Sequence, residues 1–107
     1  MIKIKIFLFC FVLISCNLRS SNSYYLEAVK LEDEGKYEEA IALLDKAIKK
    51  NPRNLYALMN RGVDKSFLED YHGAIEDYNL IIEIDEKNTL AYMNRGKDLQ
   101  QITIWQV

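Results

Sequence analysis

The sequence is poor in the residues from which most catalytic and metal sites are built. Its 107 residues include one histidine, two cysteines, one proline and four glycines. His72 has no second histidine, and the two cysteines lie near the N-terminus, so neither a metal site nor a nucleophile–base pair can be completed. We expect His72 on an exposed helix face. The sequence therefore predicts no enzyme, no metal and no cofactor.

Charge excludes another class of function. The net charge is −2 and the isoelectric point is near 5.4, whereas a protein that binds nucleic acid usually has a basic face. No glycine-rich phosphate loop is present. We interpret the acidic clusters as solvated charge at turns and on exposed helix faces. These clusters are residues 32–34, 38–39 and 69–70.

The N-terminus is expected to be a targeting segment. Lys3 and Lys5 precede an apolar run, residues 6–14, that is far shorter than the ~20 residues of a membrane-spanning helix. Residues 13–16, Leu-Ile-Ser-Cys, resemble the processing box of bacterial lipoproteins. That resemblance implies removal of residues 1–15, lipidation of Cys16, and export to the bacterial cell envelope with a membrane anchor.

An ordinary signal peptide with a chance cysteine at the cut is the alternative interpretation. Residues 16–23 are polar and serine-rich after the cysteine, and we interpret them as a tether.

The rest of the chain repeats itself every 34 residues. The segment 59–62, Met-Asn-Arg-Gly, recurs unchanged as residues 93–96. Tyr37 and Tyr71 are separated by the same interval. A fixed period of this length is typical of an array of helical repeats.

Small residues recur at places where two helices would cross. Gly62 and Gly96 fall inside expected helices, where glycine costs about 1 kcal/mol relative to alanine. That cost is understandable if a neighbouring helix lies too close for a side chain. Ala28 holds the same place in the first unit, and Ala40 and Ala74 are expected at the facing contact.

These positions resemble the tetratricopeptide repeat family over about residues 21–101. The departures from its pattern are Lys65, where an aromatic is usual, Glu86, in place of the closing proline, and Asp64 and Asp98, where a small residue is usual. The resemblance implies an all-α fold of antiparallel helix–turn–helix repeats, stacked as a short right-handed α-solenoid of about two and a half units.

The expected units are residues 24–54, 55–88 and a partial third unit, 89–107. Apolar spacing predicts their helices at residues 24–34, 37–50, 55–68, 71–84 and 89–101. Asp70 is a predicted N-cap.

Two interpretations of residues 89–107 stay open. In one they form a capping helix, with Ile102, Ile104 and Trp105 folding back on the second unit. In the other the sequence is a truncated product of a longer repeat protein. An exposed last helix would also allow a homo-oligomer.

The family resemblance implies a concave groove lined by the first helix of each unit. Met59 and Met93 occupy equivalent places there, and methionine adapts to varied partners. Alternatively, part of this strip packs as core. The groove residues are Tyr25, Val29, Tyr56, Met59, Val63, Phe67, Met93 and Lys97.

We therefore predict a membrane-anchored, non-enzymatic module that binds a peptide or protein segment and no nucleic acid. Some family members clamp the C-terminal carboxylate of a peptide. Asn60 matches one clamp residue, but Tyr25, Val29, Leu90 and Asn94 replace others. We therefore expect no carboxylate clamp.

Overall fold

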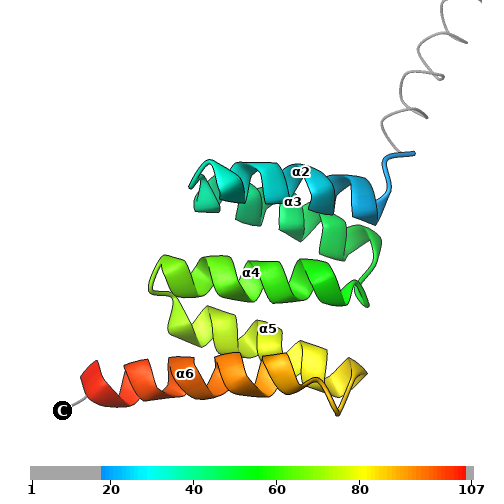
Figure 1. The fold of residues 1–107 in the computed structure, drawn as a ribbon. Coiled ribbons are helices and arrows are strands. Elements are labelled where there is room, and N and C mark those ends of the chain that lie inside the picture. The colour runs from blue at the N-terminus through cyan, green and yellow to red at the C-terminus, as the bar shows by residue number, and fades with distance from the viewer. Residues whose placement is uncertain (1–17, 106–107) are drawn as a thin grey trace, which may run out of the picture.

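The computed structural model describes residues 18–105, so the predictions for the signal peptide and Cys16 lie outside the described residues. This part of the chain contains five α-helices and no strand. Figure 1 shows them in chain order. They are α2 (Ser21–Asp33), α3 (Tyr37–Lys50), α4 (Leu55–Phe67), α5 (Tyr71–Ile84) and α6 (Thr89–Trp105).

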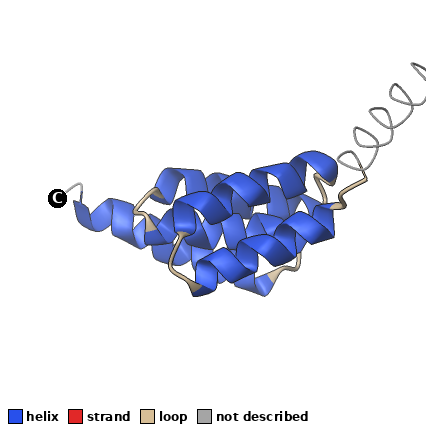
Figure 2. Ribbon diagram, turned by 90° about the horizontal axis from the view of Figure 1, so that it is seen from above, coloured by secondary structure: helices blue, strands red, loops and turns tan. Residues whose placement is uncertain are grey.

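The helices stack in one layer after another, and each packs against the next in sequence (Figures 1 and 2). The first helices of the units also contact one another, α2 with α4 and α4 with α6. Within the described residues, α3 and α5 make no such contact. The stack is therefore closer along the α2–α4–α6 side, which makes that side concave. The predicted helical repeat fold is confirmed.

The same capping device starts each first helix. Ser20, Asn54 and Asn88 lie 34 residues apart and precede α2, α4 and α6. The side-chain oxygen of each accepts a hydrogen bond from the backbone N–H three residues later, at 3.1, 3.1 and 3.0 Å. Such caps satisfy N–H groups that have no partner within the helix. Asp70 caps α5 in the same way, as predicted.

The prediction of a tether through residue 23 is wrong for residues 21–23, because α2 begins at Ser21. The Ser21 hydroxyl donates to the carbonyl of Ala47 at 2.6 Å and accepts from the Asn54 side-chain amide at 2.9 Å. These bonds hold the start of α2 against the end of α3 and the α3–α4 turn. The serine-rich composition that suggested a tether serves a helix start instead.

Small side chains dominate the two core clusters. All ten cluster residues are at most 1% exposed, and this includes Ala28, Ala40 and Ala74, as expected from the repeat pattern. The first cluster is Ala28, Ala40, Leu44, Ala47 and Ala57. The second is Leu58, Ala74, Tyr78, Ile81 and Ala91.

The two repeated glycines lie in different surroundings. A Cβ atom added to Gly62 would stand 2.6 Å from a ring carbon of Tyr78, so a close crossing does require glycine there. A Cβ atom on Gly96 would meet nothing within 4 Å. The expectation of a close crossing at Gly96 is wrong, because no helix of the described chain covers that side of α6.

The C-terminal helix is longer than predicted. It continues to Trp105, without a fold-back, and Ile104 is 64% exposed (Figure 1). The capping interpretation is therefore wrong for Ile104, while Ile102 is half-buried. After Gly96 no glycine or proline interrupts the helix, and the Thr103 hydroxyl donates to the carbonyl of Leu99 at 2.9 Å.

Candidate functional site

The predicted groove residues divide into two groups along the concave side. At one end, the rings of Tyr25 and Tyr56 lie 6.0 Å apart, tilted by 40°. Tyr25 and Val29 are half-buried, and Tyr25 packs against the first core cluster. Tyr56 is 71% exposed. At this end, therefore, the exposed ring of Tyr56 packs against the half-buried ring of Tyr25.

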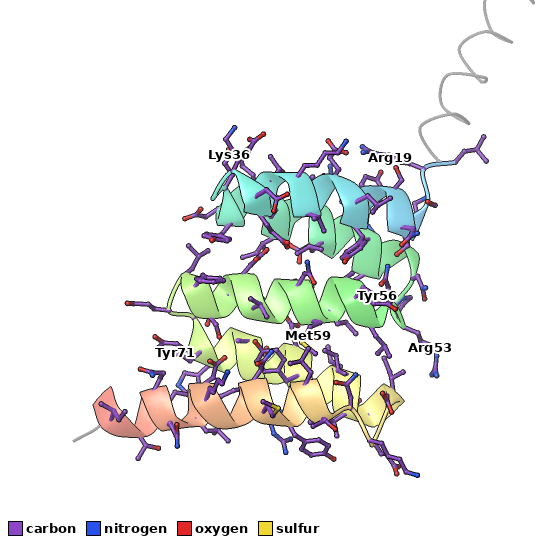
Figure 3. All side chains as sticks on the ribbon, viewed as in Figure 1. Arg19, Lys36, Arg53, Tyr56, Met59 and Tyr71 are labelled. Carbon is purple, nitrogen blue, oxygen red and sulfur yellow. The ribbon has the colours of Figure 1, made fainter. Side chains whose placement is uncertain are left out.

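The two equivalent methionines differ in their exposure. Met59 is half-buried, packs against the second core cluster, and its sulfur accepts a long hydrogen bond from the Asn94 amide at 3.5 Å. In Figure 3 its side chain lies between α4 and α6. Met93 on α6 is 53% exposed. Part of the predicted strip is thus core, while Met93 is accessible to a ligand.

The second group lines an open cavity of about 430 Å³ between α4 and α6. It brings together the predicted residues Val63, Phe67 and Lys97. The Phe67 ring stacks on Tyr37, with ring centroids 4.9 Å apart, so one face of it is fixed. The remaining lining residues are Ser66, Tyr71, Tyr78, Asn94, Asp98 and Gln101.

The polar groups of this cavity differ in their freedom to bind. Asp98 accepts a short hydrogen bond from the Ser66 hydroxyl, and burial raises the pKa of Asp98 although that bond opposes the shift. Burial also raises the pKa of Tyr78 to about 12, so its phenol stays neutral. Lys97 is exposed and forms no ion pair within residues 18–105. The accessible charge of the cavity is therefore positive.

Two carboxyl groups, of which one is buried and the other half-buried, lie together between α2 and α4. Asp64 is 2% exposed, and burial followed by the neighbouring Glu32 raises the pKa of Asp64 to about 8. Asn60 donates to both oxygens of Glu32, at 3.2 and 2.9 Å. Asp64 therefore keeps its proton at neutral pH. The prediction that residues 32–34 form an exposed acidic cluster is wrong for Glu32, which is half-buried.

Sequence reasoning missed an ion-pair network centred on Arg61. Its guanidinium donates to Asp77 at 2.6 and 3.0 Å and to Asp45 at 2.8 Å. Lys65 adds a contact to Asp77 at 3.2 Å, which explains why a lysine replaces the usual aromatic. Burial opposes the charge of Arg61, but the two aspartates outweigh burial and raise its pKa.

A signal for this network was present in the sequence. Arg61 recurs as Arg95, and the residues 16 positions earlier, Asp45 and Asn79, bind them in the same way, each at 2.8 Å. Reading the 34-residue period for polar residues as well as small ones would have found it.

The histidine and the acidic residues of the described chain form no metal-binding cluster. His72 is exposed, as predicted. Residues 18–105 contain no cluster of three or more histidine, cysteine or acidic residues that could hold a metal ion. Nor does any helix in this range have the length and apolar content needed to cross a membrane.

The repeat geometry defines a helical-repeat protein, and comparisons support a particular family. The model of the tetratricopeptide repeat (TPR) family matches residues 21–54, which span α2, α3 and the turn that follows. This match starts at the helix start that the tether prediction missed. No curated protein matches the sequence.

Solved structures share the fold. The second TPR of Spaghetti (RPAP3), bound to the HSP90 peptide SRMEEVD, is 24% identical, with a TM-score of 0.76 and 81% of each chain covered. The first TPR of Spaghetti (RPAP3), bound to the same peptide, is 27% identical, with a TM-score of 0.71; 79% of this chain and 72% of that chain are covered. These likenesses support a TPR fold and a protein-interaction module.

Proposed function

We propose that this protein is a non-enzymatic interaction module that binds a peptide or protein segment along its concave side. The cavity between α4 and α6 carries this proposal, because it combines a fixed aromatic ring, Phe67, with the unpaired cation Lys97. Peptide sites commonly join apolar pockets to a few polar groups that fix orientation. TPR structures of similar fold are bound to a peptide, which supports a peptide as the kind of ligand.

The favoured ligand places an apolar side chain against Val63 and Phe67 and an acidic or amide group beside Lys97. A free C-terminal carboxylate is not its main anchor. Asn60, the residue that matches a clamp asparagine, already donates to both oxygens of Glu32. Removing it from that contact would leave a half-buried carboxylate without its donor, which costs free energy.

Selection of displayed peptides on the full chain tests the groove. Met93→Glu is expected to weaken the binding of the selected peptides roughly tenfold or more, because it places a charge in an apolar contact. Leu80→Glu is the matched control, since Leu80 is also exposed, at 41%, but lies on α5 and not on one of the helices of the concave side. Equal loss in both variants, or loss in neither, would contradict the concave site.

The peptide SRMEEVD is a second probe. We expect the full chain to bind it no better than its C-terminally amidated form. Micromolar binding that disappears in Asn60→Ala would show a carboxylate clamp and would contradict the proposed ligand chemistry.

Membrane anchoring through Cys16 belongs to the same proposal. It rests on the lipoprotein-like segment 13–16. Cys16→Ala is expected to accumulate as an uncleaved precursor that takes up no labelled palmitate. Normal processing of that variant would contradict the proposed membrane anchor, and it would not bear on the concave site.

A further inference from the structure

Helix α6 repeats the surface with which α4 holds α5. On α4 this surface consists of Leu58, Arg61, Gly62 and Lys65. Leu58 belongs to the core cluster of Ala74 and Tyr78, Gly62 lies under the Tyr78 ring, and Arg61 and Lys65 bind Asp77. Thirty-four residues later stand Tyr92, Arg95, Gly96 and Leu99. We refer to these four residues as the α6 outer face.

The α6 outer face is open in the described chain. Tyr92 is 43% exposed and Leu99 is 48% exposed, whereas Leu58, the equivalent of Tyr92, is 1% exposed. Gly96 leaves a notch that no atom fills within 4 Å of an added Cβ. An aromatic ring occupies the corresponding notch at Gly62.

Arg95 makes one hydrogen bond where Arg61 makes three. Its Nη1 donates to Asn79 at 2.8 Å, as Arg61 Nη1 donates to Asp45. Arg61 also binds Asp77 on the covering helix. Within residues 18–105 no carboxylate binds Arg95, and its guanidinium lies over the Tyr92 ring at 5.1 Å. A covering helix with an acid at this point would complete its contacts.

We propose that the α6 outer face binds, in trans, an amphipathic helix of a partner protein with the order small residue, acid, aromatic that Ala74, Asp77 and Tyr78 show in α5. The aromatic residue fills the notch at Gly96, and the acid pairs with Arg95. Charge complementarity and the α4–α5 contact within this molecule specify both positions.

A second copy of α6 does not meet this requirement. Asp98 is the one acidic residue in α6, and it is 6% exposed and bound by Ser66. Two α6 helices packed together would bring Arg95 no accessible carboxylate. The surface is also separate from the proposed peptide site, since none of its four residues lines the cavity.

The test uses the full chain in a mild non-ionic detergent and a fluorescent peptide with the sequence of residues 70–87, capped at both ends. We expect saturable binding by fluorescence anisotropy. Gly96→Ala should weaken it roughly tenfold or more, because the added Cβ occupies the place of the aromatic ring. The same variant should melt no lower than the parent, since the site is open and alanine favours the helix.

A charge exchange sharpens the test. Arg95→Glu is expected to weaken binding of the parent peptide. A peptide that carries Asp77→Lys should bind this variant again. A structural effect of Arg95→Glu would weaken both peptides alike and contradict the pairing.

Other results would overturn the proposal. No saturable binding would exclude a helix of this chemistry, and binding unchanged in Gly96→Ala would place the peptide elsewhere. If light scattering finds a dimer that Gly96→Ala converts to a monomer, the occupant is a second copy instead of a foreign helix. None of these results depends on the concave groove, which Met93→Glu tests separately.

Discussion

Helices α4 and α6 contain the same four residues, Met-Asn-Arg-Gly, in the same place, yet the two segments have different surroundings. Gly62 lies under a buried tyrosine ring, and Gly96 faces open space. Arg61 binds two carboxylates, and Arg95 binds one amide. In the described chain, α4 is covered on both sides by other helices, whereas α6 packs against one side only.

The comparison separates two kinds of information in a repeat. The repeated residues specify a helix and the geometry of its next contact. Whether that contact stabilises the fold depends on the helix that arrives there. Equivalent substitutions in α4 and α6 should therefore differ in size, and in one case in sign.

The largest difference is expected at the arginines. Arg61→Ala should lower the free energy of unfolding by about 3 kcal/mol, because it leaves the buried Asp77 with Lys65 alone. Arg95→Ala should cost less than about 1 kcal/mol, since its partner Asn79 is exposed. Thermal or urea unfolding followed by circular dichroism measures both. Similar costs would show that the α6 site is as complete as the α4 site.

The buried carboxyl of Asp64 makes stability depend on pH. In the folded chain Asp64 keeps its proton up to about pH 8, whereas the unfolded carboxyl loses it near its ordinary pKa of 3.8. Between these values the unfolded state binds fewer protons, so the free energy of unfolding falls as pH rises, by at most about 1.4 kcal/mol per unit. Melting temperatures from pH 5 to pH 8 should therefore decrease.

Asp64→Asn removes the titrating carboxyl group and should make the melting temperature depend less on pH. Buried Asp98 has a raised pKa for the same reason and contributes in the same direction, so Asp98→Asn is a useful second variant. A decrease that is equally steep in Asp64→Asn would show that Asp64 is ionised in the folded chain.

A smaller difference is expected between the turns inside the first two units. Gly35 and Glu69 are equivalent by the 34-residue period, and both have positive φ, 74° and 64°. A residue other than glycine is destabilised by roughly 1 kcal/mol in this conformation. Glu69→Gly should therefore raise the free energy of unfolding by up to about 1 kcal/mol, and Gly35→Ala should lower it by a similar amount. Urea titration of both variants checks the pair, and the same sign in both would contradict the equivalence.

Much of the fold could be predicted because its determinants are local and periodic. Small residues such as Ala40 and Ala74, the tyrosines that open α3 and α5, and the cap at Asp70 recur or follow simple helix rules. The start of α2 was missed for a different reason. Serine is common in both tethers and helix caps, and only the 34-residue relation of Ser20 to Asn54 distinguishes the two.

The site was less predictable because burial depends on neighbours distant in the sequence. Met59 and Met93 are equivalent in the repeat, but α6 partly covers Met59 while Met93 stays exposed. The sequence marked Asp64 only as a departure from the family pattern and gave Asp77 no role, yet both side chains are buried. Periodicity gives each residue a position but not its degree of burial.

The central claim is that α6 presents the same helix-binding surface as α4, without a helix on it. Gly62→Ala and Gly96→Ala in the full chain, compared by urea unfolding in one buffer, test it most directly. We predict opposite signs. Gly62→Ala lowers the free energy of unfolding by about 1–3 kcal/mol, because the Tyr78 ring over Gly62 is buried, and Gly96→Ala raises it by up to about 1 kcal/mol. If both substitutions destabilise the chain to a similar extent, a helix already covers Gly96 and the claim is wrong.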